Sequence, residues 1–342
     1  MSIKSRISAV CELSNFFKAI AEQNAAVTDF NSKLKLAEIQ NPWFTADNLN
    51  YCFKQWSEEL TEEKITKWLA DYNFFGEPKT VGIIMAGNIP LVGLHDLISV
   101  ILSGHNAMVK TSSKDDVLMT AVIDFLKSQN DDLKNSISKV EKLENYQAVI
   151  ATGSNNTARY FEFYFKDIPH IIRKNRTGVA VLDGNESEGN LNKLADDIFR
   201  YFGLGCRNVT HLFLPQNYNT DLLFEAFYGW KDIINHPKYA NNYDYNRAIY
   251  LMEKQAFLDN NFVMLRKADE FHSPISVINY SFYDNLTQLK EKLIEKQDEI
   301  QCIVGKSFPE FENSVGFGQS QKPGLKDYAD GVDVMKFLEF EN

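Results

Sequence analysis

The sequence has few cysteines and no long apolar run, and these shortages exclude several classes of protein. Its four cysteines, Cys11, Cys52, Cys206 and Cys302, lie far apart and form no C-x-x-C pair. A disulfide framework or a zinc site is therefore not expected, and a reducing cytoplasm is the expected location. The charged N-terminus has no apolar run behind it, so we expect no signal peptide. No apolar stretch approaches membrane-spanning length.

The chain also lacks a positive charge balance, internal repeats and low-complexity blocks. Because the net charge is −10, a nucleic acid or an anionic membrane is not expected as the main partner. No grouping of histidines and carboxylates suggests a metal, and Asp115–Asp116 and Asp196–Asp197 are interpreted as solvated helix faces. The composition, 44% hydrophobic and 24% charged, is ordinary for a soluble globular protein, and 342 residues are enough for two domains or one large one.

The first 75 residues carry the spacing of amphipathic helices. Leu13, Phe16, Phe17 and Ile20 recur at intervals of one, three and four, and residues 61–64 form the polar start of a further helix. We therefore expect an N-terminal helical segment before any sheet.

From Thr80 onward, short apolar strands alternate with helices. A strand at 80–85, a turn at 86–90, a helix at about 91–102 and a strand at 107–110 form a β-α-β unit, which implies a parallel sheet. Pro90 suits the first position of that helix, where its missing N–H has no cost. The later expected elements are a helix at 117–127, a strand at 147–151, a helix opened by 152–156, strands at 179–182, 210–214, 262–265, 275–279 and 300–304, and helices at 218–234, 244–256 and 284–297.

The expected fold is α/β, with two parallel-sheet domains after the helical segment. Residues 1–173 hold the N-terminal helices and the first sheet, and the boundary lies near Lys174. Residues 174–315 hold the domain that contains Cys206. Residues 316–342 form a glycine-rich loop and a closing strand.

Cys206 lies in the most informative stretch, residues 202–208, which read Phe-Gly-Leu-Gly-Cys-Arg-Asn. The glycines beside it let backbone amides approach an incoming group and leave the thiol open to a ligand. A thiolate there is a nucleophile with oxyanion-binding N–H groups beside it. The alternative for this cysteine, taken alone, is a small buried side chain at a tight turn.

Three other segments are candidate cofactor contacts. Gly87–Asn88 and Gly153–Ser154 fall where strands lead into helices, and helix N-termini attract phosphates through their N–H groups and dipole. Lys110 ends a strand and suits ribose hydroxyls or a phosphate, although taken alone it is a solvated strand end. Gly203-x-Gly205 does not complete a G-x-G-x-x-G motif, because no strand precedes it and position 208 is Asn, which argues against an ordinary Rossmann dehydrogenase.

Taken in order, these segments resemble the aldehyde dehydrogenase superfamily. They are more similar to its acyl-CoA reductase branch, the family of the fatty-acyl reductase of bacterial bioluminescence. The resemblance runs from about Thr80 to Phe340, and the order of six motifs favours a catalytic Cys206. The motifs are Ala86-Gly87-Asn88-Ile89-Pro90, Val109-Lys110-Thr111-Ser112-Ser113, Thr152-Gly153-Ser154, Phe202 to Asn208, Glu270-Phe271-His272-Ser273-Pro274, and Gly316-Phe317-Gly318 with Lys322 and Gly324.

The resemblance implies a role for each site residue and an NADP-binding function for residues 1–173. Cys206 is the implied nucleophile, and the amide of Asn88 holds the substrate oxyanion. Lys110 contacts the adenine ribose, Gly153–Ser154 lies near the pyrophosphate, and Glu270 holds the nicotinamide ribose.

Two departures from the family pattern bear on the reaction. Oxidative aldehyde dehydrogenases carry a water-activating glutamate before the strand that leads to the cysteine domain, whereas residues 170–177 contain no carboxylate. A missing base fits thioester reduction, because the acyl-enzyme must not be hydrolysed. His170 lies near this position, and its role stays open. Ser113 and Lys114 stand where NAD-selective relatives often have a glutamate, and a cation there favours a 2′-phosphate.

The resemblance therefore implies NADPH-dependent reduction of a fatty acyl thioester to an aldehyde. The implied substrate is an acyl-CoA or an acyl-carrier thioester, with an acyl-activating protein as a further candidate partner and a homo-oligomer as the assembly. Aldehyde oxidation with NAD(P) is an alternative that the missing carboxylate disfavours. A redox-silent cysteine acyltransferase leaves Glu270 and Lys110 without a role, and a non-catalytic scaffold needs none of these motifs.

Overall fold

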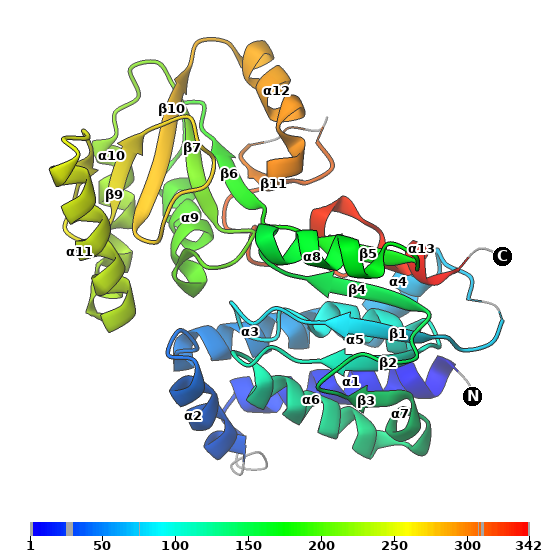
Figure 1. Ribbon diagram of the computed structural model, residues 1–342. Coiled ribbons are helices and arrows are strands. Elements are labelled where there is room, and N and C mark those ends of the chain that lie inside the picture. Colours follow the sequence, from blue (N-terminus) through cyan, green and yellow to red (C-terminus); the bar gives the residue numbers. More distant parts are fainter. Residues whose placement is uncertain (1–2, 25–29, 75, 307, 309–310, 341–342) are drawn as a thin grey trace. The chain divides into compact units, whose positions relative to one another are not determined.

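The computed structural model describes residues 3–24, 30–74, 76–306, 308 and 311–340 (Figure 1). The chain folds as two compact units, each with its own sheet. Unit 1 comprises Met1–Asn175 and Gly324–Asn342, and unit 2 comprises Arg176–Pro323. The end of the chain therefore folds with the N-terminal unit, while residues 316–323 belong to unit 2.

Unit 1 begins with helices, as the apolar spacing predicts. Its elements in chain order, with η for a 3-10 helix, are α1 (Ile3–Ala21), α2 (Asn31–Gln40), α3 (Ala46–Glu59), α4 (Glu62–Leu69), β1 (Thr80–Ile84), α5 (Leu94–Leu102), β2 (Asn106–Lys110), α6 (Asp116–Gln129), α7 (Asp131–Ser136), β3 (Ile137–Lys139), β4 (Ala148–Thr152), α8 (Asn155–Phe165), β5 (His170–Arg173), η5 (Ala329–Gly331) and α13 (Val334–Leu338). The polar start predicted at 61–64 is confirmed, because the Thr61 side chain accepts a hydrogen bond from the Lys64 N–H at 3.4 Å.

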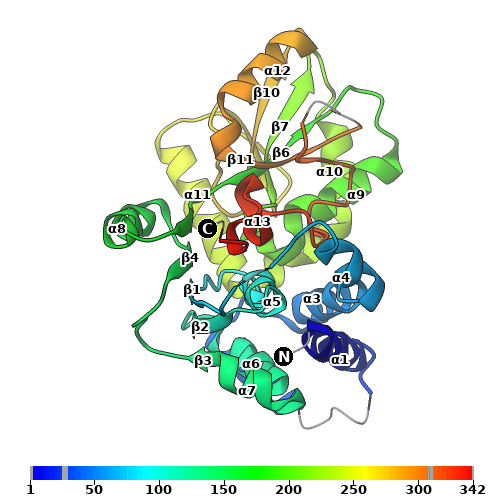
Figure 2. The same ribbon diagram turned by 90° about the vertical axis from the view of Figure 1, so that its right-hand side faces the viewer.

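The described strands of unit 1 form a parallel sheet in the order β3-β2-β1-β4-β5. Residues 148–151 of β4 are all buried, as expected for a parallel strand whose sheet is covered on both faces. The chain passes from β1 to β2 and β3 in one direction, and then to β4 and β5 in the other. Since β-α-β crossovers are right-handed, this reversal places α8 on the opposite face of the sheet from α5 (Figure 2).

The turn after β1 differs from the prediction. The following helix begins at Leu94 rather than Leu91, so Pro90 does not occupy its first position. Leu91 has a φ of 54°, a left-handed conformation that a right-handed helix does not contain. Residues 86–93 therefore form a longer connection than the sequence suggests.

The closing segment also differs from the prediction, because it is the helix α13 and not a strand. Asp333 caps this helix by accepting a hydrogen bond from the Lys336 N–H at 2.9 Å. Val334, Met335 and Leu338 are its buried residues, and their spacing of one, three and four is helical. The apolar run at 332–340 therefore follows the period of a helix.

Unit 2 contains the remaining alternation of strands and helices. Its elements are β6 (Thr177–Val181), α9 (Glu188–Phe199), η2 (Arg200–Gly203), β7 (Val209–Pro215), α10 (Asp221–Phe227), η3 (Tyr228–Asn235), α11 (Pro237–Met252), β8 (Leu258–Asp259), β9 (Met264–Lys267), β10 (Val277–Tyr283), α12 (Leu286–Glu295), η4 (Gln297–Glu299), β11 (Ile300–Val304) and β12 (Ser314–Val315). The single helix expected at 218–234 is divided into α10 and the 3-10 helix η3.

The described strands of unit 2 form a sheet in the order β12-β11-β6-β7-β10-β9-β8. Its neighbours run parallel except for the antiparallel pair β8 and β9. After β10 the chain returns across the sheet to β11, on the far side of β6. This reversal places α12 on the opposite face from α9 and α11 (Figure 1). The predicted α/β fold with two parallel-sheet domains is confirmed.

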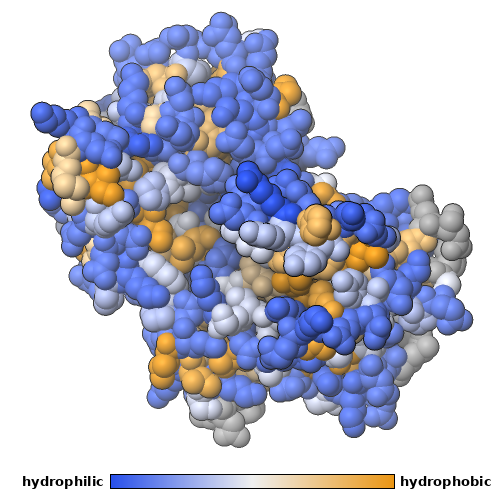
Figure 3. Space-filling model, in the orientation of Figure 1, coloured by the Kyte–Doolittle hydropathy of each residue, from blue (hydrophilic) through white to orange (hydrophobic). Residues whose placement is uncertain are grey.

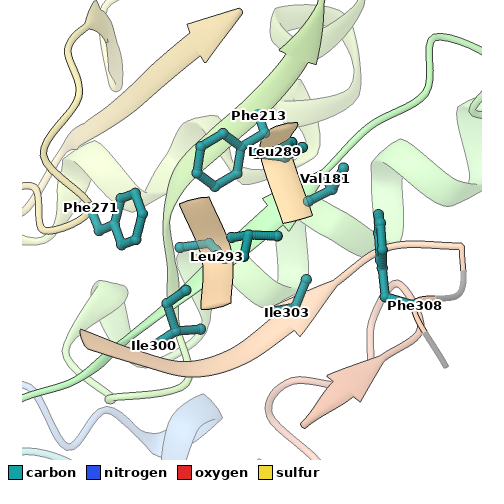
Figure 4. Close-up of a cluster of buried hydrophobic side chains, with 9 residues drawn as sticks. Val181, Phe213, Phe271, Leu289, Leu293, Ile300, Ile303 and Phe308 are labelled. Carbon is teal, nitrogen blue, oxygen red and sulfur yellow. The ribbon is translucent and has the colours of Figure 1, made fainter. Parts of the chain in front are cut away.

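The face of this second sheet that α12 covers forms an apolar core (Figure 4). Leu289 and Leu293 of α12 pack among Val181 of β6, Phe213 of β7 and Ile303 of β11. Each of these side chains is at most 4% exposed. Burial of this kind stabilises the fold by roughly 25 cal/mol for each Å² of apolar area removed from water.

The surface in the view of Figure 3 is mostly hydrophilic. An apolar patch lies over the carboxyl end of α11 (Figure 3), where Leu251 and Met252 are exposed. In the described part of the chain, no helix combines the length and hydrophobicity needed to cross a membrane.

Candidate active site

The sheet of unit 1 reverses its strand order between β1 and β4. Open parallel sheets bind ligands outside the carboxyl ends of their strands at such a reversal. Ile84 of β1 pairs with Ala151 of β4, so the turns that follow these strands start from neighbouring positions. These turns contain Gly87–Asn88 and Gly153–Ser154, the predicted oxyanion and phosphate contacts.

The Asn88 turn is tied to the loop after β2. The Asn41 side-chain amide donates to the Gly87 carbonyl at 3.4 Å and to the Lys114 carbonyl at 3.2 Å. A Cβ at position 87 would lie 2.6 Å from Ser112 Oγ, so glycine is required for this close approach. The predicted oxyanion turn and the predicted ribose-binding loop are therefore neighbours within unit 1.

Lys110, Ser113 and Lys114 are all exposed at the carboxyl end of β2. Their backbone is ordered by local hydrogen bonds, since the Lys110 carbonyl accepts from the Met85 N–H at 3.0 Å. Ser112 Oγ accepts from the Lys114 N–H at 3.3 Å. Residues 110–114 contain two lysines and no carboxylate, a set of donors that suits a phosphate.

Ser154 is the N-cap of α8, as the predicted turn implies. Its Oγ accepts a hydrogen bond from the Thr157 N–H at 3.3 Å. A Cβ at Gly153 would approach Thr157 Cβ to 3.0 Å, which explains the glycine at this close contact. The other N–H groups of the first turn face the end of the helix and suit an anion.

In unit 2, Cys206 follows a strained stretch of backbone. Tyr201, Phe202 and Gly203 have φ values of 54°, 59° and 76°, in the left-handed region that side chains other than glycine rarely adopt. Cys206 belongs to the connection between η2 and β7, and it is half-buried. Strain of this kind often accompanies functional sites.

The Asn208 side chain holds this loop together. Its Oδ1 accepts from the Gly205 N–H at 2.8 Å, and its Nδ2 donates to the carbonyls of Asp197, Ile198 and Arg200 at 2.8 to 3.2 Å. The side chain is fully buried, so these bonds satisfy its polar atoms. The sequence did not reveal this role: it identifies Asn208 as the end of the nucleophile-loop motif and as a departure from a glycine motif.

Asp197 links the same loop to the glycine-rich segment. Its carboxylate accepts from the Gly318 N–H at 2.6 Å and from the Ser320 N–H at 2.9 Å. Burial raises the pKa of Asp197 to about 6, while these N–H groups oppose the rise. The Ser320 carbonyl in turn accepts from Arg207 Nε at 2.6 Å.

The interpretation of Asp115 and Asp197 as solvated residues is wrong, since both are at most 2% exposed. The spacing of apolar residues in the sequence did indicate that these two positions are buried. Asp197 lies three residues after Leu194, and Asp115 lies three residues before Leu118, so each continues an apolar helical stripe.

Glu270 lies in the connection between β9 and β10, where its backbone is fixed and its side chain is exposed. Its carbonyl accepts from Asn279 Nδ2 at 2.8 Å and pairs with His211 Nδ1 at 3.0 Å. Its carboxylate is 70% exposed and lies 3.4 Å from Arg266. Thr210 Oγ1 donates to the Phe271 carbonyl at 2.6 Å, which holds this segment against the start of β7.

His211 and Asn279 are structural residues that sequence analysis did not identify. Because His211 Nδ1 faces a carbonyl, it carries the proton there, and Nε2 accepts from Ser281 Oγ at 2.9 Å. Burial lowers the pKa of His211 to about 4. The histidine is therefore neutral at pH 7.

The region where oxidative relatives carry a glutamate contains the strand β5. Arg173 forms a buried bidentate ion pair with Asp96 at 2.6 and 2.7 Å. His170 Nδ1 pairs with the Ile168 carbonyl at 2.8 Å. Among the residues that the structure describes, no group of three or more His, Cys, Asp or Glu side chains suits a metal.

Comparison with known proteins identifies a family match that spans several of the predicted site residues. Residues 59–222 match the family described as acyl-CoA reductase (LuxC). This segment includes Asn88, Lys110 and Cys206. No curated protein sequence matches the chain.

Similar folds are found among solved structures. Aldehyde dehydrogenase 21 from Physcomitrella patens, in complex with the reaction product succinate, has a TM-score of 0.69 and 11% identity, covering 99% of this chain and 84% of that one. An oxidoreductase from Marinobacter aquaeolei has a TM-score of 0.67 and 11% identity, covering 99% and 85%. Indole-3-acetaldehyde dehydrogenase complexed with NAD+ has a TM-score of 0.64 and 12% identity, covering 89% and 72%.

At these identities, the solved structures establish a shared fold and no more. The family match adds the acyl-CoA reductase sequence pattern over residues 59–222. The two findings confirm the predicted resemblance to the acyl-CoA reductase branch of the aldehyde dehydrogenase superfamily.

Proposed function

We propose that this chain reduces a fatty acyl thioester to an aldehyde with NADPH, through an acyl-enzyme on Cys206. The observation that carries the proposal is the acyl-CoA reductase match, whose residues 59–222 include Asn88 and Cys206. The absence of a carboxylate from residues 170–177 supports reduction rather than hydrolysis of the acyl-enzyme.

The proposed first step is acylation of Cys206. Its thiolate attacks the thioester carbonyl carbon, and the negative charge that develops on oxygen is held by the Asn88 amide and the Cys206 backbone N–H. The bond from carbon to the carrier sulfur then breaks, and the carrier thiolate leaves and takes up a proton. The strained backbone at Tyr201 and Phe202 supports this role, because it fixes how the half-buried thiol is presented.

Each predicted cofactor contact has a side chain or backbone suited to one part of a phosphorylated dinucleotide. The exposed Ser113 and Lys114 suit a 2′-phosphate, Lys110 the adenine ribose, and Gly153–Ser154 at the start of α8 the pyrophosphate. Glu270 is the proposed contact of the nicotinamide ribose, for which its exposed carboxylate must exchange Arg266 for the ribose hydroxyls. When bound, NADPH supplies the hydride that the acyl carbon accepts.

The proposed last step releases the aldehyde. After reduction, the thiohemiacetal oxyanion on Cys206 is held by the same two donors. Its collapse breaks the bond between carbon and Cys206 Sγ, which returns the thiolate. Water must not be activated for attack on the acyl-enzyme before reduction is complete, and the absence of a carboxylate from residues 170–177 serves this requirement.

A panel of acyl-CoA chain lengths with NADPH tests the proposal, by aldehyde detection and mass spectrometry of the protein. Cys206→Ala should abolish aldehyde formation and the acyl adduct, because the attacking atom is lost. NADPH should still quench protein fluorescence in that variant, and Cys11→Ala, a half-buried cysteine of unit 1, is the matched control. Substantial turnover by Cys206→Ala, or an adduct on another cysteine, contradicts the mechanism.

The same assay separates the alternatives. Aldehyde oxidation with NAD(P) would give acid from aldehyde without a thiol acceptor, and an acyltransferase would form the adduct without consuming NADPH. Parallel reactions with acyl-CoA and acyl-carrier-protein thioesters identify the substrate form. An acyl-activating partner, a homo-oligomeric state and a cytoplasmic location stay predictions.

A further inference from the structure

Asp115 is a buried carboxyl group that the proposed mechanism does not use. It occupies the N-cap position of α6, yet its side chain makes no hydrogen bond to that helix. It reaches instead to the turn after β1, where Asp115 Oδ2 accepts from the Leu91 N–H at 2.7 Å. An aspartate at an N-cap ordinarily bonds the second or third N–H of its own helix, so this diversion requires another explanation.

The Leu91 N–H belongs to a backbone that is unfavourable by itself. Leu91 has a φ of 54°, and a left-handed conformation is disfavoured for a side chain with Cβ. Pro90 disfavours the helical region for the residue before it, which reduces the number of alternative conformations open to the turn. The bond to Asp115 therefore selects this conformation of the turn that carries Asn88.

Asp115 is also joined to the predicted cofactor loop, because it directly follows residues 110–114. A Cβ at Gly87 would lie 3.2 Å from Asp115 Cβ, so the Asp115 side chain lies close to Gly87, the residue before Asn88. The side chain is 2% exposed, and its Oδ1 has no hydrogen-bond partner among the described residues. One buried group thus connects the loop proposed for the ribose with the turn proposed for the oxyanion.

We infer that Asp115 is the positioning residue of the Asn88 turn, which it holds in the conformation that presents the Asn88 amide to the substrate oxyanion. This role rests on the proposed function, since it acts through Asn88. Asp115 touches neither substrate nor cofactor in this role.

The charge state of Asp115 suggests a conservative variant. Burial raises the pKa of the Asp115 carboxyl well above its ordinary range, the Leu91 N–H opposes the rise, and Asp116 adds to it. The site therefore favours a neutral side chain of the same shape. Asparagine retains an oxygen acceptor for the Leu91 N–H, so Asp115→Asn should restore most of the function that Asp115→Ala loses.

The experiment measures single-turnover acylation of Cys206 by acyl-CoA in the full chain. Asp115→Ala should slow acylation on the order of 100-fold, since a displacement of about 1 Å can have that effect. NADPH affinity, read by fluorescence, should change by less than about threefold. Asp115→Asn should acylate within about fivefold of wild type, and Asp124→Ala, an exposed aspartate of the same helix, is the control.

A double mutant tests whether Asp115 acts through Asn88. If it does, Asn88→Ala with Asp115→Ala should acylate at about the rate of Asn88→Ala alone, because the second change has no donor left to misplace. The inference is overturned if the double mutant acylates more slowly than Asn88→Ala by the full factor that Asp115→Ala shows alone. It is also overturned if Asp115→Ala acylates at the wild-type rate.

Hydrogen exchange at the Leu91 amide separates failure of this inference from failure of the proposed function. Asp115→Ala should raise the exchange rate of this amide at least about tenfold, and Asp115→Asn should not, since only alanine removes the acceptor. If wild type forms no acyl adduct, the proposed function fails. The exchange rate of the Leu91 amide still tests whether Asp115 holds the turn. Unchanged exchange in Asp115→Ala overturns the link between Asp115 and the turn.

Discussion

The backbone that leads to Cys206 is held in a conformation that most residues avoid. Tyr201 and Phe202 both have left-handed φ values, each unfavourable by roughly 1–2 kcal/mol. The four hydrogen bonds of the buried Asn208 side chain offset this cost, because they satisfy three carbonyls and one N–H of the same segment. The geometry at the thiol therefore depends on a side chain two positions away.

Replacing Asn208 by alanine should destabilise unit 2 and reduce the reactivity of Cys206. Each buried carbonyl or N–H left without its partner costs about 1–3 kcal/mol, so we expect a loss of at least about 2 kcal/mol in the free energy of unfolding. Urea titration and the rate of Cys206 alkylation check this. Asn242→Ala is the control, since that half-buried side chain donates a hydrogen bond to the Lys238 carbonyl within its own helix. Equal effects of the two substitutions would contradict the role of Asn208.

The proposed preference for NADPH over NADH depends on Lys114. A cation near a 2′-phosphate contributes on the order of a few kcal/mol at a protein surface before desolvation, and about 1.4 kcal/mol of net attraction gives a tenfold preference. Lys114→Glu should therefore raise the KM for NADPH at least about tenfold and change that for NADH much less. Lys134→Glu on the exposed face of α7 controls for net charge. Equal use of both cofactors by wild type would refute the assignment of this loop.

At the scale of single elements, α12 shows how one helix stabilises a sheet face. Leu289 and Leu293 lie one turn apart on its buried side, against β6, β7 and β11 (Figure 4). The next residue, Ile294, is 54% exposed. Adjacent positions of one helix thus have opposite environments, as a period of 3.6 residues requires.

Leu293→Ala should lower the free energy of unfolding by about 2–5 kcal/mol, because it removes buried atoms and leaves a cavity. Ile294→Ala, at the neighbouring exposed position, should change it by less than about 0.5 kcal/mol. Chemical denaturation of both variants gives the comparison. Similar losses for the two would mean that α12 does not cover the sheet as described.

At the scale of the whole molecule, two buried titratable groups of unit 2 give stability opposite pH dependences. Burial lowers the pKa of His211 from 6.5 to about 4, so its contribution is complete above pH 6.5 and lost as the pH falls to about 4. Burial raises the pKa of Asp197 from 3.8 to about 6, so its contribution is complete below pH 3.8 and lost as the pH rises through about 6. Between pH 4 and 6, the changes that His211 and Asp197 make in the free energy of unfolding therefore largely cancel.

The His211 contribution should emerge from comparison of wild type with His211→Gln. The excess stability of wild type should shrink by about 3 kcal/mol from pH 7 to pH 4, since each pKa unit corresponds to about 1.4 kcal/mol. Denaturant titrations at several pH values measure this difference, and His170→Gln, a half-buried histidine of unit 1, is the control. A difference that stays constant with pH would show that His211 is not held neutral.

The sequence by itself determined the fold class and the order of the elements. Apolar periodicity is a local property, so the helices of the first 75 residues and most strands could be predicted, as could the turn that Ser154 caps. Prediction from the sequence failed where the local pattern is ambiguous. The apolar run at 332–340 suits either a strand or a helix, and the N-cap at Asp333 favours the helix.

Only the tertiary structure decided which residues support the candidate site. Asn208 forms hydrogen bonds with the end of α9, Asp197 with Gly318, and Asp115 with Leu91, and each contact joins residues that are not neighbours in the sequence. Composition suggests that aspartates are solvated, because charge burial is costly. Burial of an aspartate becomes favourable only where backbone N–H groups of another segment donate hydrogen bonds to its carboxylate. Such hydrogen bonds form only in the folded chain.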